Sequence, residues 1–335
     1  MPNWCANNLK IHGSLEQIAE IKKLMNGEVC PYYFNAVNRS IKFFIVGIAG
    51  IAQIIPSELM LEDNTFDAIS STFMVLHSHI TPTPMNIAFT QWFNLLRTNP
   101  DLSYENSTRI IQLYEQSGLT SFSLDILAPE QKQVIHEIMA AQSYDWLGVF
   151  GYAPDKLNEC WEKLDETKTS TQPFDMRQLI APKLIPELVG FNGHWFDKVF
   201  TNSKTSYHEY IDTYGVKWPS GSDLHLEDLS DKTATGIALI TSNQISHTIS
   251  VDFDTPWAPP NQAVFMALSA KFQCHVIHYF CEQGANFCGR HEYKSGELID
   301  ECNGELEWRE TDEDDYGTEL VGPAYILNNL RNYGG

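Results

Sequence analysis

The 335-residue sequence predicts an α+β fold, and three features of the chain lead to that prediction. The chain opens with an alternating segment and a capped helix, continues with helical periodicity, and returns to alternating segments with turn signals. A strand, a helix, a strand and then a meander indicate a sheet layered with a helix. Hydrophobic residues make up 43% of the chain, which is enough apolar material for a buried core.

Residues 1–55 are predicted to form a strand-helix-strand segment. Apolar and polar residues alternate toward the end of 4–13, and a capping box over 14–17 begins a helix that ends at an Asn-Gly pair. The apolar run over 43–52 is about half as long as a membrane-spanning helix. Its β-branched residues and glycines favour a buried strand, so the sequence predicts no membrane span.

Residues 56–205 are predicted to be a mainly helical insertion. Apolar residues recur there at helical spacing, and a proline in the first turn or a glycine after the last turn marks several helix ends. The predicted helices cover 87–97, 104–116, 129–142 and 155–164.

Residues 206–335 are predicted to form a sheet-and-helix domain with an acidic tail. Strands are expected over 237–240, 248–253 and 274–280, and a helix over 262–272 follows two prolines. Two turn signals, at 294–297 and at Asn303-Gly304, predict a hairpin meander that continues through Trp308.

The formal net charge is −21, which bears on the kind of partner this chain binds. A surface this negative repels nucleic-acid phosphates, so direct binding to nucleic acid is disfavoured. The same charge suits a basic protein, and its carboxylates could stand where a DNA-binding enzyme expects phosphates. Solubility alone is the alternative explanation.

The cysteine pattern bears on the cellular compartment. Seven cysteines are present, and no basic segment followed by an apolar run opens the chain. An odd number of cysteines in a chain of this length favours reduced thiols over a disulfide framework. The sequence therefore predicts a cytoplasmic protein.

Several short motifs, taken in order, resemble the YubB-like family of plasmid and phage proteins. They are MPNWCANNL over 1–9, YGVKWP over 214–219, FDTPWAPP over 253–260 and GANFCG over 284–289. The resemblance implies a ferredoxin-like C-terminal domain and an origin in a mobile element. It supplies no established activity and no catalytic residues.

The two tryptophan motifs carry the most distinctive candidate site. Trp218 and Trp257 lie beside Lys217 and a stiff proline-rich stretch, which could line a pocket for a small molecule or a peptide. The alternative is a rigid corner that caps the sheet and binds nothing.

An acidic segment near the end is a second candidate, as a docking strip for a basic groove. Such blocks are more often solvated surface. The carboxylates in question are Glu305, Glu307, Glu310, Asp312, Glu313, Asp314 and Asp315.

A metal site or a catalytic centre is not expected. Cysteines and histidines occur at Cys274, His275, His278, Cys281, Cys288 and His291, but there is no CxxC pair, and strand alternation points them to opposite faces. Asp252 and Asp254 share a strand face and could hold a cation, although they more simply form its solvated side. No motif of a hydrolase or nucleotide-binding enzyme is present, so we predict neither metal nor other cofactor.

These observations favour a non-catalytic, acidic interaction protein of a phage or plasmid. A basic host enzyme of defence or nucleic-acid processing is the expected partner. The alternatives are a small-ligand binder or enzyme that uses the tryptophan-lined region, and RNA binding on the sheet face.

Overall fold

The computed structural model describes residues 3–59, 80–196, 204–229, 247–310 and 317–335. The chain divides into two compact units, which we call the sheet unit and the helical unit. The sheet unit consists of Met1–Cys30, Thr169–Ile180 and Tyr210–Gly335, and the helical unit consists of Pro31–Lys168 and Ala181–Glu209. These boundaries differ from the predicted 1–55, 56–205 and 206–335, because the N-terminal strand and helix belong to the same unit as the C-terminal strands.

The sheet unit is built on a six-stranded antiparallel sheet with the strand order β2-β3-β1-β4-β5-β6. The N-terminal strand β1 (Trp4–Gly13) lies between strands that come from the last third of the chain. The other five strands are β2 (Ser222–Asp228), β3 (His247–Pro256), β4 (His275–Glu282), β5 (Phe287–Lys294) and β6 (Glu297–Gly304).

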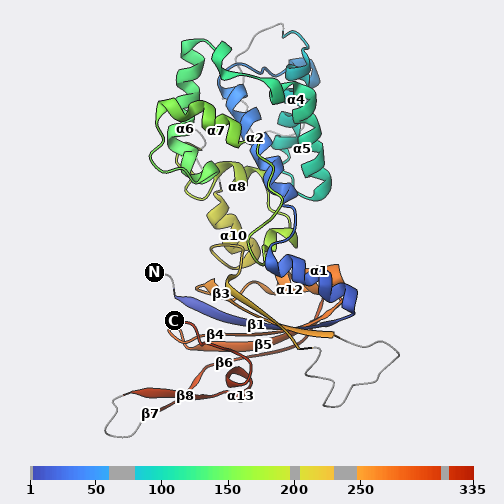
Figure 1. Ribbon diagram of the computed structural model, residues 1–335, viewed down its shortest axis with the longest axis vertical. Helices are drawn as coiled ribbons and strands as arrows, with labels where there is room; N and C mark the ends of the chain where they lie inside the picture. The colour runs from blue at the N-terminus through green and yellow to red at the C-terminus, as the bar shows by residue number, and fades with distance from the viewer. Residues whose placement is uncertain (1–2, 60–79, 197–203, 230–246, 311–316) are drawn as a thin grey trace. The chain divides into compact units, whose positions relative to one another are not determined.

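This arrangement is ferredoxin-like. The helices α1 (Leu15–Asn26) and α12 (Gln262–Phe272) lie on one face of the sheet, as Figure 1 shows. The order β1-α1-β2-β3-α12-β4, with the strands side by side as β2-β3-β1-β4, is the split βαβ pattern of that fold. The predicted fold class is therefore confirmed, and the helical unit is inserted between α1 and β2.

The core of the sheet unit follows from two periodicities. Alternate strand residues such as Ile11, Ile249 and Val276 are fully buried, and so are Ile21 and Phe265 on the two helices. The predicted capping box of α1 is present, since the backbone N–H of Gln17 donates to the Ser14 hydroxyl at 3.3 Å and the Ser14 N–H donates to the Gln17 side chain at 2.7 Å.

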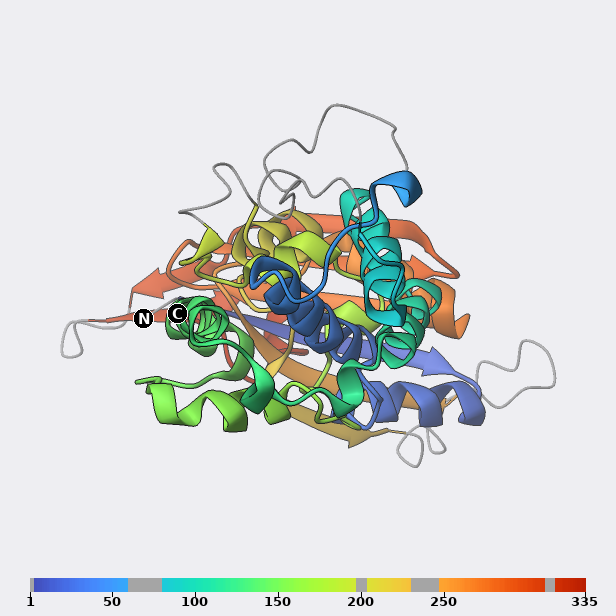
Figure 2. The same cartoon turned by 90° about the horizontal axis from the view of Figure 1, so that it is seen from above.

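The helical unit is organised around one buried helix. In Figures 1 and 2, α2 (Tyr32–Ile48) lies between the α4–α5 pair and the α6–α7 pair, and most of its residues are buried. The surrounding helices are α4 (Pro84–Arg97), α5 (Tyr104–Ser117), α6 (Pro129–Leu147), α7 (Leu157–Lys163) and α8 (Leu184–Val189), while α10 (Ser206–Tyr214) crosses the boundary between the units.

The prediction of a strand within 43–52 is wrong, because α2 extends to Ile48. A helix that is buried all around shows a continuous apolar run instead of a 3.6-residue period, and such a run cannot be distinguished from a buried strand by pattern. Within the described parts of the chain, no helix is both long enough and apolar enough to cross a membrane.

Smaller elements complete the chain. A separate hairpin of β7 (Glu307–Glu310) and β8 (Thr318–Gly322) precedes the short helix α13 (Ala324–Leu327). Single turns of 3₁₀ helix occur at Pro56–Glu58, Leu119–Ser121, Leu124–Ile126, Pro154–Lys156 and Met176–Gln178. The predicted strand over 237–240 lies outside the described residues.

A buried charge lies inside the helical unit. The Lys42 ammonium is fully buried, contacts the Asp165 carboxylate and lies 4.2 Å from the centre of the Trp161 ring. Burial lowers the pKa of Lys42 to about 8, although Asp165 opposes that shift. The Tyr114 hydroxyl also donates to Asp165, at 2.7 Å. Within the described residues, Asp165 is the carboxylate that pairs with this buried cation.

We expect Asp165→Asn to destabilise the protein by about 2–3 kcal/mol, because it leaves the buried Lys42 charge uncompensated. This value lies at or below the lower end of the roughly 3–5 kcal/mol for broken buried pairs, since the Asp165 side chain is 35% exposed. Lys42→Met should change the free energy of unfolding by less than about 1 kcal/mol, because it removes the buried charge itself. Urea denaturation measures both. Glu159→Gln, which breaks an exposed pair with Lys163, is the control, and equal effects of all three variants would contradict the prediction.

Candidate functional site

The face of the sheet opposite α1 and α12 carries polar side chains along β1 and β3. Asp252 and Asp254 alternate along β3 with the buried Val251 and Phe253, so the two carboxylates lie on this face as the alternation predicted. In the paired strand β1, Asn8 is opposite Asp252.

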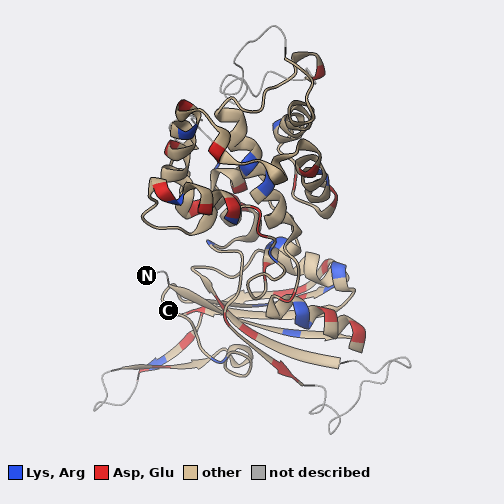
Figure 3. Ribbon diagram, turned by 45° about the horizontal axis from the view of Figure 1, so that its top comes forward, with Lys and Arg blue, Asp and Glu red and all other residues tan. Residues whose placement is uncertain are grey.

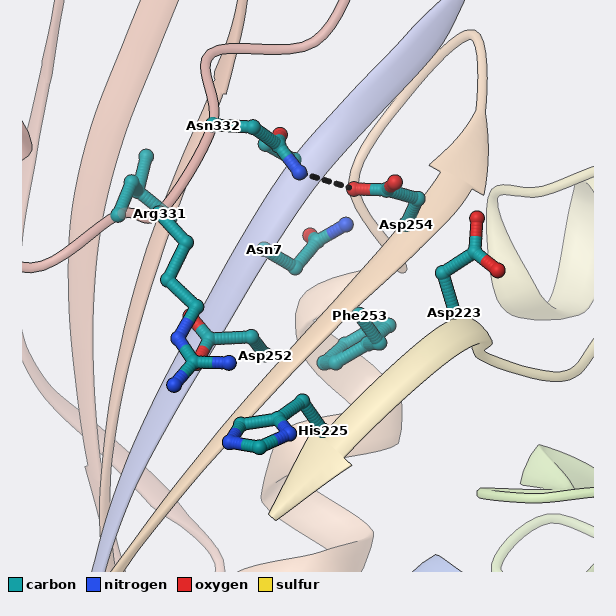
Figure 4. Close-up of a pocket in the computed structure, with 10 residues that line it drawn as sticks. Asn7, Asp223, His225, Asp252, Phe253, Asp254, Arg331 and Asn332 are labelled. Carbon is teal, nitrogen blue, oxygen red and sulfur yellow. Dashed lines mark hydrogen bonds and ion pairs between the residues drawn. The ribbon is translucent and has the colours of Figure 1, made fainter. Parts of the chain in front are cut away.

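A hollow of about 90 Å³ is present where β1, β2 and β3 meet the C-terminal segment that follows α13 (Figure 4). The strand register places His225 opposite Asp252. The pairing is irregular between Ser222 and His225, and Asp223 in this stretch also lines the hollow. The described lining residues are Ala6, Asn7, Asp223, His225, Asp252, Phe253, Asp254, Leu330, Arg331 and Asn332.

The charges around this acidic hollow are only partly compensated. Asp252 accepts from the Asn8 amide at 2.9 Å and pairs with Arg331 at 3.3 Å, and Asp254 accepts from the Asn332 amide at 3.5 Å. Burial raises the pKa of Asp254, and the neighbouring charges of Asp223 and Asp252 raise it further. Among the described lining residues, three carboxylates face one guanidinium.

The structure brings the predicted residues Lys217, Trp218 and Trp257 together. The Lys217 ammonium lies 4.7 Å from the centre of the Trp218 ring and 5.3 Å from that of Trp257. Trp4, which the sequence did not single out, adds a third ring 6.3 Å from Trp218. Trp218 and Trp257 remain 38% and 45% exposed. We call these four residues the tryptophan cluster.

The tryptophan cluster and the acidic hollow lie at the same end of the sheet. Trp4 is opposite Pro256, and Ala6, which lines the hollow, is opposite Asp254. Trp4 and Ala6 are two residues apart on one strand, so they share a sheet face and are separated by about 7 Å. The backbone N–H of Trp257 donates to the Asn3 carbonyl at 2.8 Å, which fixes that tryptophan beside the start of β1.

The acidic segment is partly a hairpin. Glu305, Glu307 and Glu310 are exposed, whereas the predicted Asp312, Glu313, Asp314 and Asp315 lie outside the described residues. β7 pairs with β8, and Arg309 bridges to Glu319 at 2.7 Å, so Figure 3 shows both signs of charge on this hairpin.

The turn predicted at Asn303-Gly304 is wrong. The two residues end β6, which pairs with β5 and not with β7. The other predicted turn, at Ser295-Gly296, does connect β5 and β6, and both residues have positive φ.

The cysteines and histidines of β4 and β5 point to both faces of the sheet. His278 is buried beneath α12, with its Nε2 atom 2.9 Å from the Asn7 amide oxygen. Burial, reinforced by the nearby His291, keeps the pKa of His278 well below its ordinary value. Within the described ranges, no group of three or more Cys, His, Asp or Glu side chains could hold a metal ion.

Sequence reasoning missed Asp223, His225, Arg331 and Asn332. Arg331 and Asn332 reach the hollow only because the chain returns to β3 after α13, and no local pattern in the sequence records that return. Ile326 and Leu330 anchor the returning segment, because they pack in one cluster with Ala6 and Cys281. Two apolar residues are too short a pattern to predict that contact from the sequence.

Comparisons with known proteins agree with this architecture. Residues 30–218 match the family described as a protein of unknown function, DUF1281, and residues 239–321 match a ferredoxin-like domain of Api92-like proteins. The uncharacterized proteins YubB and YubA of Escherichia coli K12 are 37% and 29% identical, over 49% and 52% of this chain and 99% and 97% of their own lengths.

A solved structure is also similar. The crystal structure of the protein api92 from Yersinia pseudotuberculosis has a TM-score of 0.75 at 26% identity, and the match covers 92% of this chain and 99% of that one. Because the first family match spans more than half of the 335 residues, the chain belongs to the DUF1281 family.

Proposed function

We propose that this chain is a non-catalytic binding protein whose sheet unit receives an arginine or lysine side chain of a basic protein partner. The acidic hollow is the observation that supports this proposal most strongly. Asp223, Asp252 and Asp254 surround it, and burial and mutual repulsion already raise the pKa of Asp254. A cation entering the hollow would relieve that repulsion.

The size of the hollow favours a side chain over a whole small molecule. Its volume of about 90 Å³ lies far below the roughly 300–1,000 Å³ of ordinary ligand pockets. A guanidinium or ammonium head group is small enough to enter. Guanidinium is the better match, because its planar fork can donate to two carboxylate oxygens at once.

The polar face of the sheet is a poor match for nucleic acid. Arg290, which lies on this face, is held by Glu292 at 2.9 Å and by Asp300 at 2.6 Å, so its charge is already used within the chain. The net charge of −21 opposes phosphate approach over longer distances. RNA binding therefore ranks below protein binding.

The tryptophan cluster would provide the apolar part of the same interface. Tryptophan is among the residues enriched at the positions that contribute most to binding energy in protein interfaces. At about 7 Å along β1 from the hollow, Trp4 and its neighbours can contact the residues that flank an inserted side chain. The acidic hollow would bind one basic side chain, and the tryptophan cluster would provide contact area for its neighbours. Together they suit an extended basic segment of the partner.

We further propose that the chain derives from a phage or plasmid and acts in the cytoplasm. The motifs shared with the YubB-like family suggest the origin, and seven free cysteines suit a reducing compartment. A host defence or nucleic-acid-processing enzyme would then be a natural target, because such enzymes carry basic clefts.

Binding of a dye-labelled hexa-arginine peptide tests the proposal. The double variant D223N/D254N should weaken binding at least tenfold, measured by fluorescence anisotropy at low salt, because two of the three carboxylates lose their charge. The fold should persist, since burial already disfavours the charged form of Asp254.

The double variant E115Q/E166Q provides the matched control. It changes the net charge by the same amount at two exposed sites of the helical unit, and it should bind within about twofold of the original protein. If both double variants lose the same affinity for the peptide, the interaction is general charge attraction and the hollow has no specific role. Unchanged peptide affinity in D223N/D254N would also refute the role of the hollow.

A further inference from the structure

The helical unit contains a second, larger hollow with different chemistry. Its volume is about 630 Å³, and it is bounded by the C-terminal half of α6, by the segment that follows that helix, and by His194. The described lining residues are Ala140, Ala141, Ser143, Tyr144, Val149, Phe150, Gly151, Tyr152 and His194.

No Asp, Glu, Lys or Arg occurs among these described lining residues, although the chain carries 65 such residues in total, 22 basic and 43 acidic. Side chains with an aromatic ring and residues with little or no side chain make up most of the lining. A charged ligand would find no counter-charge here, whereas an uncharged apolar ligand would lose little on leaving water.

Two of the aromatic lining residues are exposed to water. Tyr144 and Phe150 have ring centres 4.0 Å apart at 37°, and they remain 44% and 77% exposed. Exposing two large rings side by side forfeits the stabilisation that burial would give. A flat ring that stacks on this pair would recover it.

The polar groups of the lining differ in what they already contact. The Ser143 hydroxyl donates to the Val149 carbonyl at 3.2 Å, and the Tyr152 hydroxyl lies 2.8 Å from the His136 imidazole. His194 is exposed, and its imidazole makes no hydrogen bond within the described part of the chain. It is therefore the side chain best able to give a ligand one directed hydrogen bond.

We infer that this hollow binds an uncharged, planar aromatic small molecule that carries one hydrogen-bonding group for His194. The volume falls within the range of about 300–1,000 Å³ typical of such sites. This inference is independent of the acidic hollow, which lies in the other unit, and the two ligand classes share no chemistry.

The neutral fluorescent probe N-phenyl-1-naphthylamine tests the inference on the intact chain. Its emission should rise saturably with one probe bound per chain. Ala140→Phe should weaken binding at least tenfold, because the added ring occupies the hollow from an exposed helix position that tolerates it. Circular dichroism verifies that this variant folds.

Ala285→Phe is the matched control, since it places the same ring at an exposed position of the sheet unit, and it should bind as the original chain does. A naphthol probe should lose affinity severalfold in His194→Ala, while N-phenyl-1-naphthylamine, with a weaker donor, loses less. The inference is overturned if no saturable binding occurs, or if Ala140→Phe and Ala285→Phe bind the probe equally well.

Discussion

The pairing of the N-terminal strand between two C-terminal strands is the constraint on which the rest of the structure depends. β1 pairs along its full length with β3 and over seven residues with β4, so Leu9 is opposite both Val251 and His278. These contacts join residues more than 230 positions apart, and β3 and β4 have no direct pairing of their own. The helical unit is therefore an insertion between α1 and β2, within a domain whose sheet has the first strand of the chain among its inner strands.

The same pairing determines which side chains reach the functional face. Strand residues alternate between the faces, so the register that buries Ile249, Val251 and Phe253 beneath the helices also presents Asp252 and Asp254 on the other side. A slip of one residue would bury both carboxylates under α1 and α12 at a large desolvation cost. The acidic hollow is thus a consequence of the core register, completed by Arg331 and Asn332 from the end of the chain.

Local sequence rules predicted the features that depend on neighbouring residues. The Ser14–Gln17 capping box, the alternation through β3 and the turn at Ser295-Gly296 all follow from short-range patterns. The same rules failed where the surrounding tertiary structure determines the local conformation. The apolar run over 43–52 mostly belongs to a helix because other helices surround it, and Asn303-Gly304 ends a strand because β7 pairs elsewhere. Three members of the tryptophan cluster, Lys217, Trp218 and Trp257, were predicted from their distinctive motifs, whereas Trp4 was not. The acidic hollow could not be predicted, because it depends on the long-range return of the chain after α13.

Native-state hydrogen exchange of the intact protein tests the role of β1 most directly. If β1 is the central strand, its amides from Cys5 to Ile11 should exchange only through global unfolding of the sheet unit, with the same free energy as amides of β3 and β4. N-terminal segments ordinarily fray and exchange early. Exchange of the β1 amides at a much lower free energy than those of β3 and β4 would contradict this account.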